Sequence, residues 1–138
     1  MNPIVRNVLA VIGGWLGGSV INMGLVRIGH SVFPIEGVDT SDVAALAEVM
    51  PTLDPKYFIF PLLAHALGTL VGAFIAALIA VKHKMKLALV VGLLFLIGGI
   101  LVSFMIPAPT WFVVTDLVLA YIPMAWIGGK LAARRSRV

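Results

Sequence analysis

The chain has 138 residues, of which 61% are hydrophobic and 12% charged, and its mean hydropathy is +1.10. A soluble domain of this size cannot bury so much apolar surface, so the composition excludes an ordinary soluble protein. Cysteine is absent, which excludes thiol catalysis, disulfides and cysteine metal sites.

The first apolar stretch covers residues 8–28 and predicts a membrane helix. Its apolar part is too long for the core of a typical signal peptide, and no clear small-x-small cleavage site follows it. On a helical wheel, Gly14, Gly18 and Asn22 share one face. Because small residues let helices approach closely in lipid, we expect this face to contact other helices.

Residues 29–56 form the long external loop and contain five of the six acidic residues. Thr40 or Ser41 can cap a short amphipathic helix within the loop, which Pro51 ends. We expect this helix to lie at the membrane surface or to cap the bundle. Asp54 and Pro55 then read as the N-cap and first position of the second span.

The second span covers residues 57–81, a length of 25 residues that can cross a hydrocarbon core of about 30 Å. Its interior Pro61 predicts a kink. Small residues, including Gly68 and Gly72, share the side of His65, and we expect helix neighbours there. Bulky residues fill the other side, where we expect lipid: Phe60, Leu63, Leu67, Leu70, Phe74 and Leu78.

The third and fourth spans are predicted at residues 87–106 and 111–131, joined by a short proline-containing turn. Gly99 and Ser103 share one face of the third span, and the fourth carries Asp116, Tyr121 and Pro123. The sequence therefore predicts an all-α fold, a four-transmembrane-helix bundle forming a single domain over residues 1–138. The expected helix-packing residues are Gly14, Gly18, Gly68, Gly72 and Gly99.

The charge distribution predicts the orientation of this bundle. Four spans put both termini on one side, and that side collects eight of the ten basic residues, leaving only Arg27 and Lys56 on the other. The positive-inside rule therefore predicts cytoplasmic termini and an external acidic loop. Orientation and anionic lipid explain the net charge of +4, so we expect the lipid bilayer, and no nucleic acid, as its partner.

Each span carries one polar residue on its small face, and together these form a predicted buried polar cluster: Asn22, His65, Ser103 and Asp116. By helical rise, Asn22 and His65 lie roughly 12 Å below the external boundary, Ser103 about 6 Å and Asp116 about 7.5 Å. An ionised Asp116 is costly in lipid, so we expect it inside the bundle, with His65 as its donor and Asn22 as the next choice. A purely structural role in joining helices is the alternative.

Two segments resemble a group of small, uncharacterised four-helix bacterial inner-membrane proteins. They are FPLLAHALGTLVGAFIAALIA in the second span and LVLAYIPMAWIGGKLA in the fourth. The resemblance implies a multi-pass protein of the bacterial inner membrane and brings no activity, substrate or catalytic residue.

Three functions are compatible with these features. The first is a non-enzymatic subunit or binding module that associates through its glycine faces, as a homo-oligomer or in a larger membrane complex. The second is a proton-coupled small transporter or channel using His65 and Asp116. The third is a lipid-modifying enzyme with Ser103 as nucleophile, which requires His65 within hydrogen-bond reach. A zinc site of His30, His65 and Asp116 lacks any H-x-x-x-H or H-x-x-E spacing, so we expect no metal and no cofactor.

Overall fold

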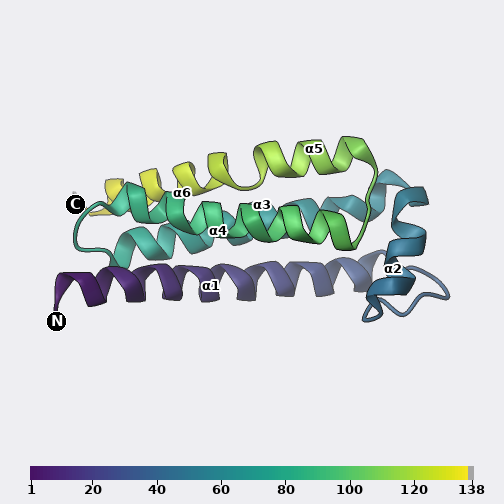
Figure 1. Cartoon of the computed structure of the whole chain (residues 1–138), viewed down its shortest axis with the longest axis horizontal. Helices are drawn as coiled ribbons and strands as arrows, with labels where there is room; N and C mark the ends of the chain where they lie inside the picture. Colours follow the sequence, from purple (N-terminus) through teal and green to yellow (C-terminus); the bar gives the residue numbers. More distant parts are fainter. Residues whose placement is uncertain (137–138) are drawn as a thin grey trace.

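The structure is a computed structural model that describes residues 1–136, and these form helices joined by turns, without a strand. The long helices run side by side along one axis (Figure 1). Four segments are long and apolar enough to cross a membrane, which confirms the predicted all-α architecture. The helices are α1 (Pro3–Val32), α2 (Val43–Val49), α3 (Ile59–Ile79), α4 (Lys84–Met105), α5 (Thr110–Leu119) and α6 (Ile122–Arg135).

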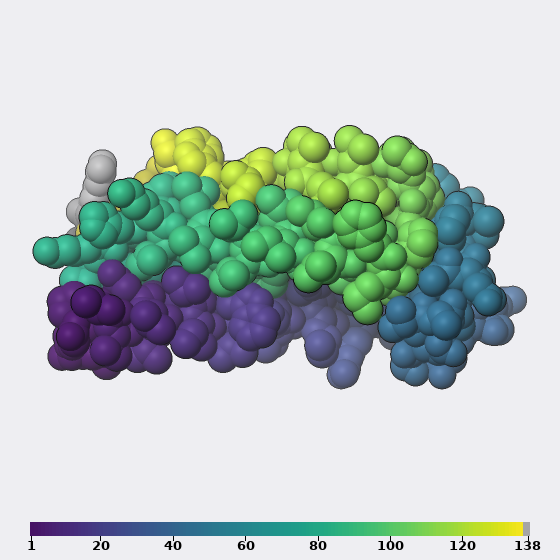
Figure 2. Space-filling view, in the orientation of Figure 1, coloured from purple at the N-terminus to yellow at the C-terminus, as the bar shows by residue number. Residues whose placement is uncertain are grey.

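The bundle has two distinct ends. At one end α1 begins, α3 turns into α4 and α6 ends; we call it the terminal end (Figure 1). At the other end lie residues 33–58 and the turn between α4 and α5; we call it the loop end, and Figure 2 shows its blue atoms gathered beyond α1 and α5. Basic residues collect at the terminal end: Arg6, Lys82, Lys84, Lys86, Lys130, Arg134 and Arg135. Arg137 lies outside the described residues.

The short helix in the loop is present, but its predicted cap is wrong. Asp42 caps α2, and its Oδ1 accepts hydrogen bonds from the backbone N–H of Ala44 (2.9 Å) and Ala45 (3.3 Å). Ser41 is engaged elsewhere, because its N–H and hydroxyl both donate to Asp39. These bonds stabilise the carboxylate and hold the pKa of Asp39 below its ordinary value.

The second span starts as a 3₁₀ turn, η2 (Pro55–Phe58), before it becomes α3. Asp54 caps this turn by accepting a hydrogen bond from the N–H of Lys56 at 3.2 Å. Pro61 therefore falls in the first turn of α3 and not, as predicted, in the helix interior. A first-turn N–H has no intrahelical acceptor, so proline costs the helix no hydrogen bond there.

The fourth span is broken, although the sequence predicts one helix over residues 111–131. α5 ends at Leu119 and α6 begins at Ile122, with Tyr121 outside both helices. Pro123 is the physical reason, because it offers no N–H to the carbonyl of Leu119 and its ring excludes a continuous helix. The span also continues past its predicted end, to Arg135.

Small residues bring α1 and α3 into close contact. A Cβ atom added to Gly72 would lie 2.6 Å from the carbonyl oxygen of Gly14. One added to Gly68 would lie 2.9 Å from that of Gly18. No side chain fits at such distances, so the two backbones touch as the glycine spacing predicts.

The opposite face of α3 only partly faces outward. Leu63 and Leu67 are exposed, whereas Phe74 and Leu78 pack against a cluster of buried alanines on α3, α4 and α6. The prediction of a single lipid face is wrong for this half of the helix. α3 contacts three helices, α1, α4 and α6. These neighbours cover part of its bulky face as well as its small face.

Candidate functional site

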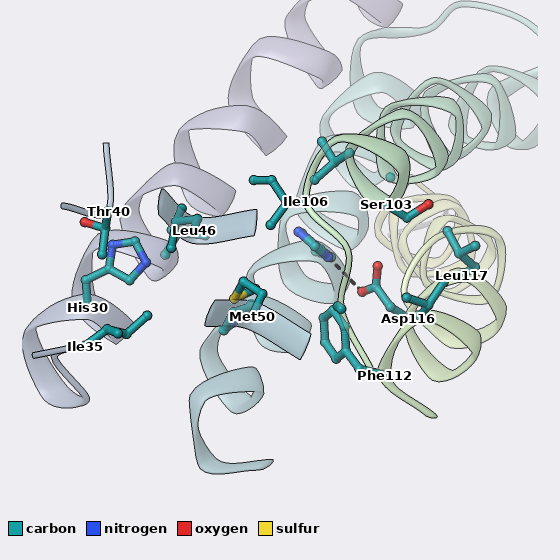
Figure 3. Close-up of a pocket in the computed structure, with 17 residues that line it drawn as sticks. His30, Ile35, Thr40, Leu46, Met50, Ser103, Ile106, Phe112, Asp116 and Leu117 are labelled. Carbon is teal, nitrogen blue, oxygen red and sulfur yellow. Dashed lines mark hydrogen bonds and ion pairs between the residues drawn. The ribbon is translucent and has the colours of Figure 1, made fainter. Parts of the chain in front are cut away.

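A cavity of about 240 Å³ lies at the loop end of the bundle. Most of its walls are apolar, and residues from the loop, including Leu46 and Met50, border it together with α1, α3, α4 and α5. In Figure 3, His30, Ile35 and Thr40 lie on one side and Ser103, Asp116 and Leu117 on the other. The remaining lining residues are Val26, Pro61, His65, Gly99, Val102, Ile106, Ala108, Phe112 and Val113.

His65 of α3 and Asp116 of α5 meet at this cavity. The distance from His65 Nδ1 to Asp116 Oδ1 is 2.7 Å, marked by the dashed line in Figure 3. The side chain of Asp116 is 6% exposed and that of His65 is 21% exposed. The contact predicted from their depth and helix face is therefore confirmed.

Tyr121 completes the group, and sequence reasoning missed this role. Its hydroxyl donates to Asp116 Oδ2 at 2.9 Å, and its ring stacks on that of His65 with centroids 5.8 Å apart. Gly99 makes room for the phenol, because an added Cβ would collide with it. Pro123 was the available signal, since a broken helix frees Tyr121 to turn back onto Asp116.

The electrostatics of the group follow from these bonds. Each oxygen of the buried Asp116 carboxylate accepts a hydrogen bond, so its burial is compensated by two donors. His65 Nδ1 is one of them, which leaves Nε2 as the free ring nitrogen. Nε2 has no hydrogen-bond partner within residues 1–136 and is not among their fully buried unpaired atoms. It therefore remains accessible, as an acceptor in the neutral ring or a donor in the charged one.

The other two predicted members do not join the cluster. Ser103 lines the same cavity, but its hydroxyl donates to the carbonyl of Ile100 on its own helix, at 2.7 Å. Asn22 lies against Gly68 and borders a separate groove along α1. Equal depth placed these residues in one layer, but depth does not fix the rotation of each helix. The Ser103–His65 pair that an enzyme would need is not formed.

His30 borders the cavity with His65 and Asp116. Within residues 1–136, no three histidine, aspartate or glutamate side chains are grouped closely enough to hold a metal ion.

Comparison of the chain with protein-family models, with curated proteins and with solved structures gives no match. Fold and site together define a class: a helical bundle suited to a membrane, with an apolar cavity that has a histidine–aspartate–tyrosine group in its wall.

Proposed function

We propose that this chain is a non-enzymatic membrane binding module that holds a small, mostly apolar molecule in its loop-end cavity. The single observation that carries this proposal is the composition of the cavity wall. It is mainly apolar, and His65, which Asp116 holds through Nδ1, contributes a second ring nitrogen, Nε2, that has no protein partner within residues 1–136. Binding sites for small molecules combine such apolar walls with few, well-placed polar groups.

The arrangement of the polar groups favours binding over catalysis. Nδ1 of His65 is held by Asp116, and Asp116 is fully engaged by His65 and Tyr121. The hydroxyl of Ser103 donates its hydrogen bond to the carbonyl of Ile100 on its own helix, so no side-chain base accepts its proton. Because the ring of His65 is held in place, its Nε2 can orient a ligand by donating or accepting one hydrogen bond.

We place the protein in the bacterial inner membrane with both termini cytoplasmic. The support is the collection of basic side chains at the terminal end, which the positive-inside rule assigns to the cytoplasm. Reporter fusions at the C-terminus and within residues 36–48 test this orientation, and a periplasmic signal from the C-terminal fusion would contradict it.

We also propose that the chain associates with itself or with a larger membrane complex. The glycine faces, which the sequence suggested as the contact surface, are not available for this association. The contact between α1 and α3 already buries four of these glycines: Gly14, Gly18, Gly68 and Gly72. A partner would therefore use other apolar surface, such as the exposed face of α4 around Leu101. The mass of the particle purified in mild detergent tests this part.

The test of binding uses the neutral fluorescent apolar amine 1-aminoanthracene with the purified protein in maltoside detergent. Val113 borders the cavity, and its neighbour Val114 is exposed on the outside of α5. We expect the wild type to bind the probe, Val113→Trp to lose binding because the indole fills the cavity, and Val114→Trp to retain it. Equal binding by both variants would show that the cavity is not the site.

A proton-coupled carrier is the second candidate, favoured by the buried His65–Asp116 pair. Intramembrane ionisable residues commonly mark proton relays. The fully buried Thr69 hydroxyl, one turn along α3 from His65, also has no hydrogen-bond partner within residues 1–136. A carrier would show pH-dependent flux in proteoliposomes that Asp116→Asn abolishes without loss of fold. A binding module shows no such flux.

A further inference from the structure

A second hollow adjoins the cavity on the outside of α1. It is a more open groove of about 660 Å³. Unlike the cavity, it is bordered mainly by polar side chains from α1 and the loop: Ser19, Asn22, Arg27, His30, Thr40 and Ser41, with Met23 and Val26. The groove therefore adds a positive charge and polar groups to a surface that is otherwise apolar, as the cavity wall is.

The two hollows share part of their border. Val26, His30 and Thr40 line both of them. Figure 3 shows His30 and Thr40 on the side of the cavity opposite Asp116. One ligand can therefore extend across these residues, with its apolar part in the cavity and its polar part in the groove.

The charge of Arg27 indicates whether the polar part of the ligand is an anion or a cation. Arg27 is exposed, and its guanidinium makes no ion pair or hydrogen bond within residues 1–136. Asp39 does not border the groove, and Ser41 donates two hydrogen bonds to its carboxylate. An anion at Arg27 therefore gains a free cation. The Thr40 hydroxyl, also at the border of the groove, makes no hydrogen bond within residues 1–136, whereas those of Ser19 and Ser41 already donate to the protein.

The axial positions match those of a lipid. Arg27 lies near the loop end of α1, and Ser19 lies roughly 12 Å deeper along the helix. In a membrane whose boundary lies near the end of α1, Arg27 is at the level of lipid head groups, and the groove runs parallel to the acyl chains. A bilayer lipid would present its phosphate at this same level.

We propose that the molecule bound by this chain is an anionic amphiphile drawn from the surrounding leaflet, with its phosphate at Arg27 and its apolar chain in the cavity. This inference rests on the proposed binding function and adds the chemical class of the ligand. His30 and Thr40, which border both the groove and the cavity, lie where the head group of the ligand joins its acyl chain. The ligand therefore enters the cavity laterally from the bilayer, past α1.

The experiment compares two competitors of bound 1-aminoanthracene that differ only in a phosphate: a monoacylglycerol and the lysophosphatidic acid with the same acyl chain. We expect the lysophosphatidic acid to displace the probe at about one tenth of the concentration, the difference expected for one charge-assisted hydrogen bond. Arg27→Gln should abolish this advantage and leave probe binding unchanged. Lys56→Gln, which removes the other basic residue of the loop end, should keep it.

The outcomes separate the two proposals. Equal displacement by both competitors, or an unchanged advantage in Arg27→Gln, overturns the head-group site while the binding module stands. Loss of the advantage when inorganic phosphate is added shows a free-phosphate site and also overturns the lipid assignment. Failure of the wild type to bind the neutral probe and both amphiphiles overturns both proposals.

Discussion

The terminal end and the loop end of the bundle are packed in opposite ways. At the terminal end, helices meet through glycine and alanine, and Ala73, Ala77 and Ala132 belong to one fully buried cluster. At the loop end, the helices are separated by a cavity and joined by the side chains of His65, Asp116 and Tyr121. The bundle is therefore held by backbone proximity at one end and, at the other, by polar side chains together with the packing of Phe58 on Trp111 and Phe112.

This difference shows how a small bundle can keep a cavity without collapsing. A void loses dispersion contacts, so its walls must be supported from elsewhere. α1 provides the link, because Gly14 is packed on α3 while Val26 and His30 border the cavity. Close packing at the terminal end fixes the helices, and the loop end can then remain open for a ligand.

The largest effect is expected from breaking the glycine contact. A leucine at Gly72 would collide with the backbone of Gly14, which cannot move aside as a side chain can. We expect Gly72→Leu to lower the free energy of unfolding by at least about 3 kcal/mol or to prevent folding. The measurement is thermal unfolding of the purified protein in detergent, together with its yield of monodisperse particles.

Gly98 supplies the matched control for this substitution. It lies within α4, and an added Cβ would meet nothing within 4 Å. Gly98→Leu should therefore unfold close to the wild-type temperature. Equal destabilisation by both substitutions would contradict the importance of the α1–α3 contact.

Much of this architecture could be predicted from sequence. Apolar length indicates the four spans, and glycine spacing indicates that Gly14 and Gly72 lie on helix-contact faces, although it does not indicate that they contact each other. The pair of His65 and Asp116 was also predictable, because a buried carboxylate needs a donor and only one ionisable candidate lies at that depth.

The remaining features depend on helix rotation and on local breaks, which periodicity does not encode. Ser103 and Asn22 have suitable depths, yet one bonds to its own helix and the other faces the groove. Tyr121 joins Asp116 only because the helix stops before Pro123. The cavity itself depends on how the loop covers the helix ends, and no local pattern specifies that.

An intermediate effect is expected from breaking the polar group at the loop end. Asp116→Leu would leave the Tyr121 hydroxyl and His65 Nδ1 without their acceptor, and we expect a loss of about 2–4 kcal/mol of stability. Asp116→Asn keeps an acceptor and should cost only about 1 kcal/mol. Thermal unfolding in detergent measures both. If Asp116→Leu were as stable as Asp116→Asn, the group would not hold the loop end together.

The smallest effect is expected at Gly24, which tests whether α1 is free of close contacts at that position. Gly24 belongs to the same helix as Gly14, but an added Cβ would meet nothing within 4 Å, whereas at Gly14 it would lie 2.8 Å from the Cβ of Ala76. Gly24→Ala therefore gains helix propensity without a collision. The gain should be at most about 1 kcal/mol, and smaller if the unfolded chain stays helical in detergent.

Gly14→Ala has the same propensity gain but a collision with α3, so it should destabilise. Unfolding temperatures of the two variants should therefore move in opposite directions, and a shift of the same sign in both would mean that α1 is packed alike at Gly14 and Gly24.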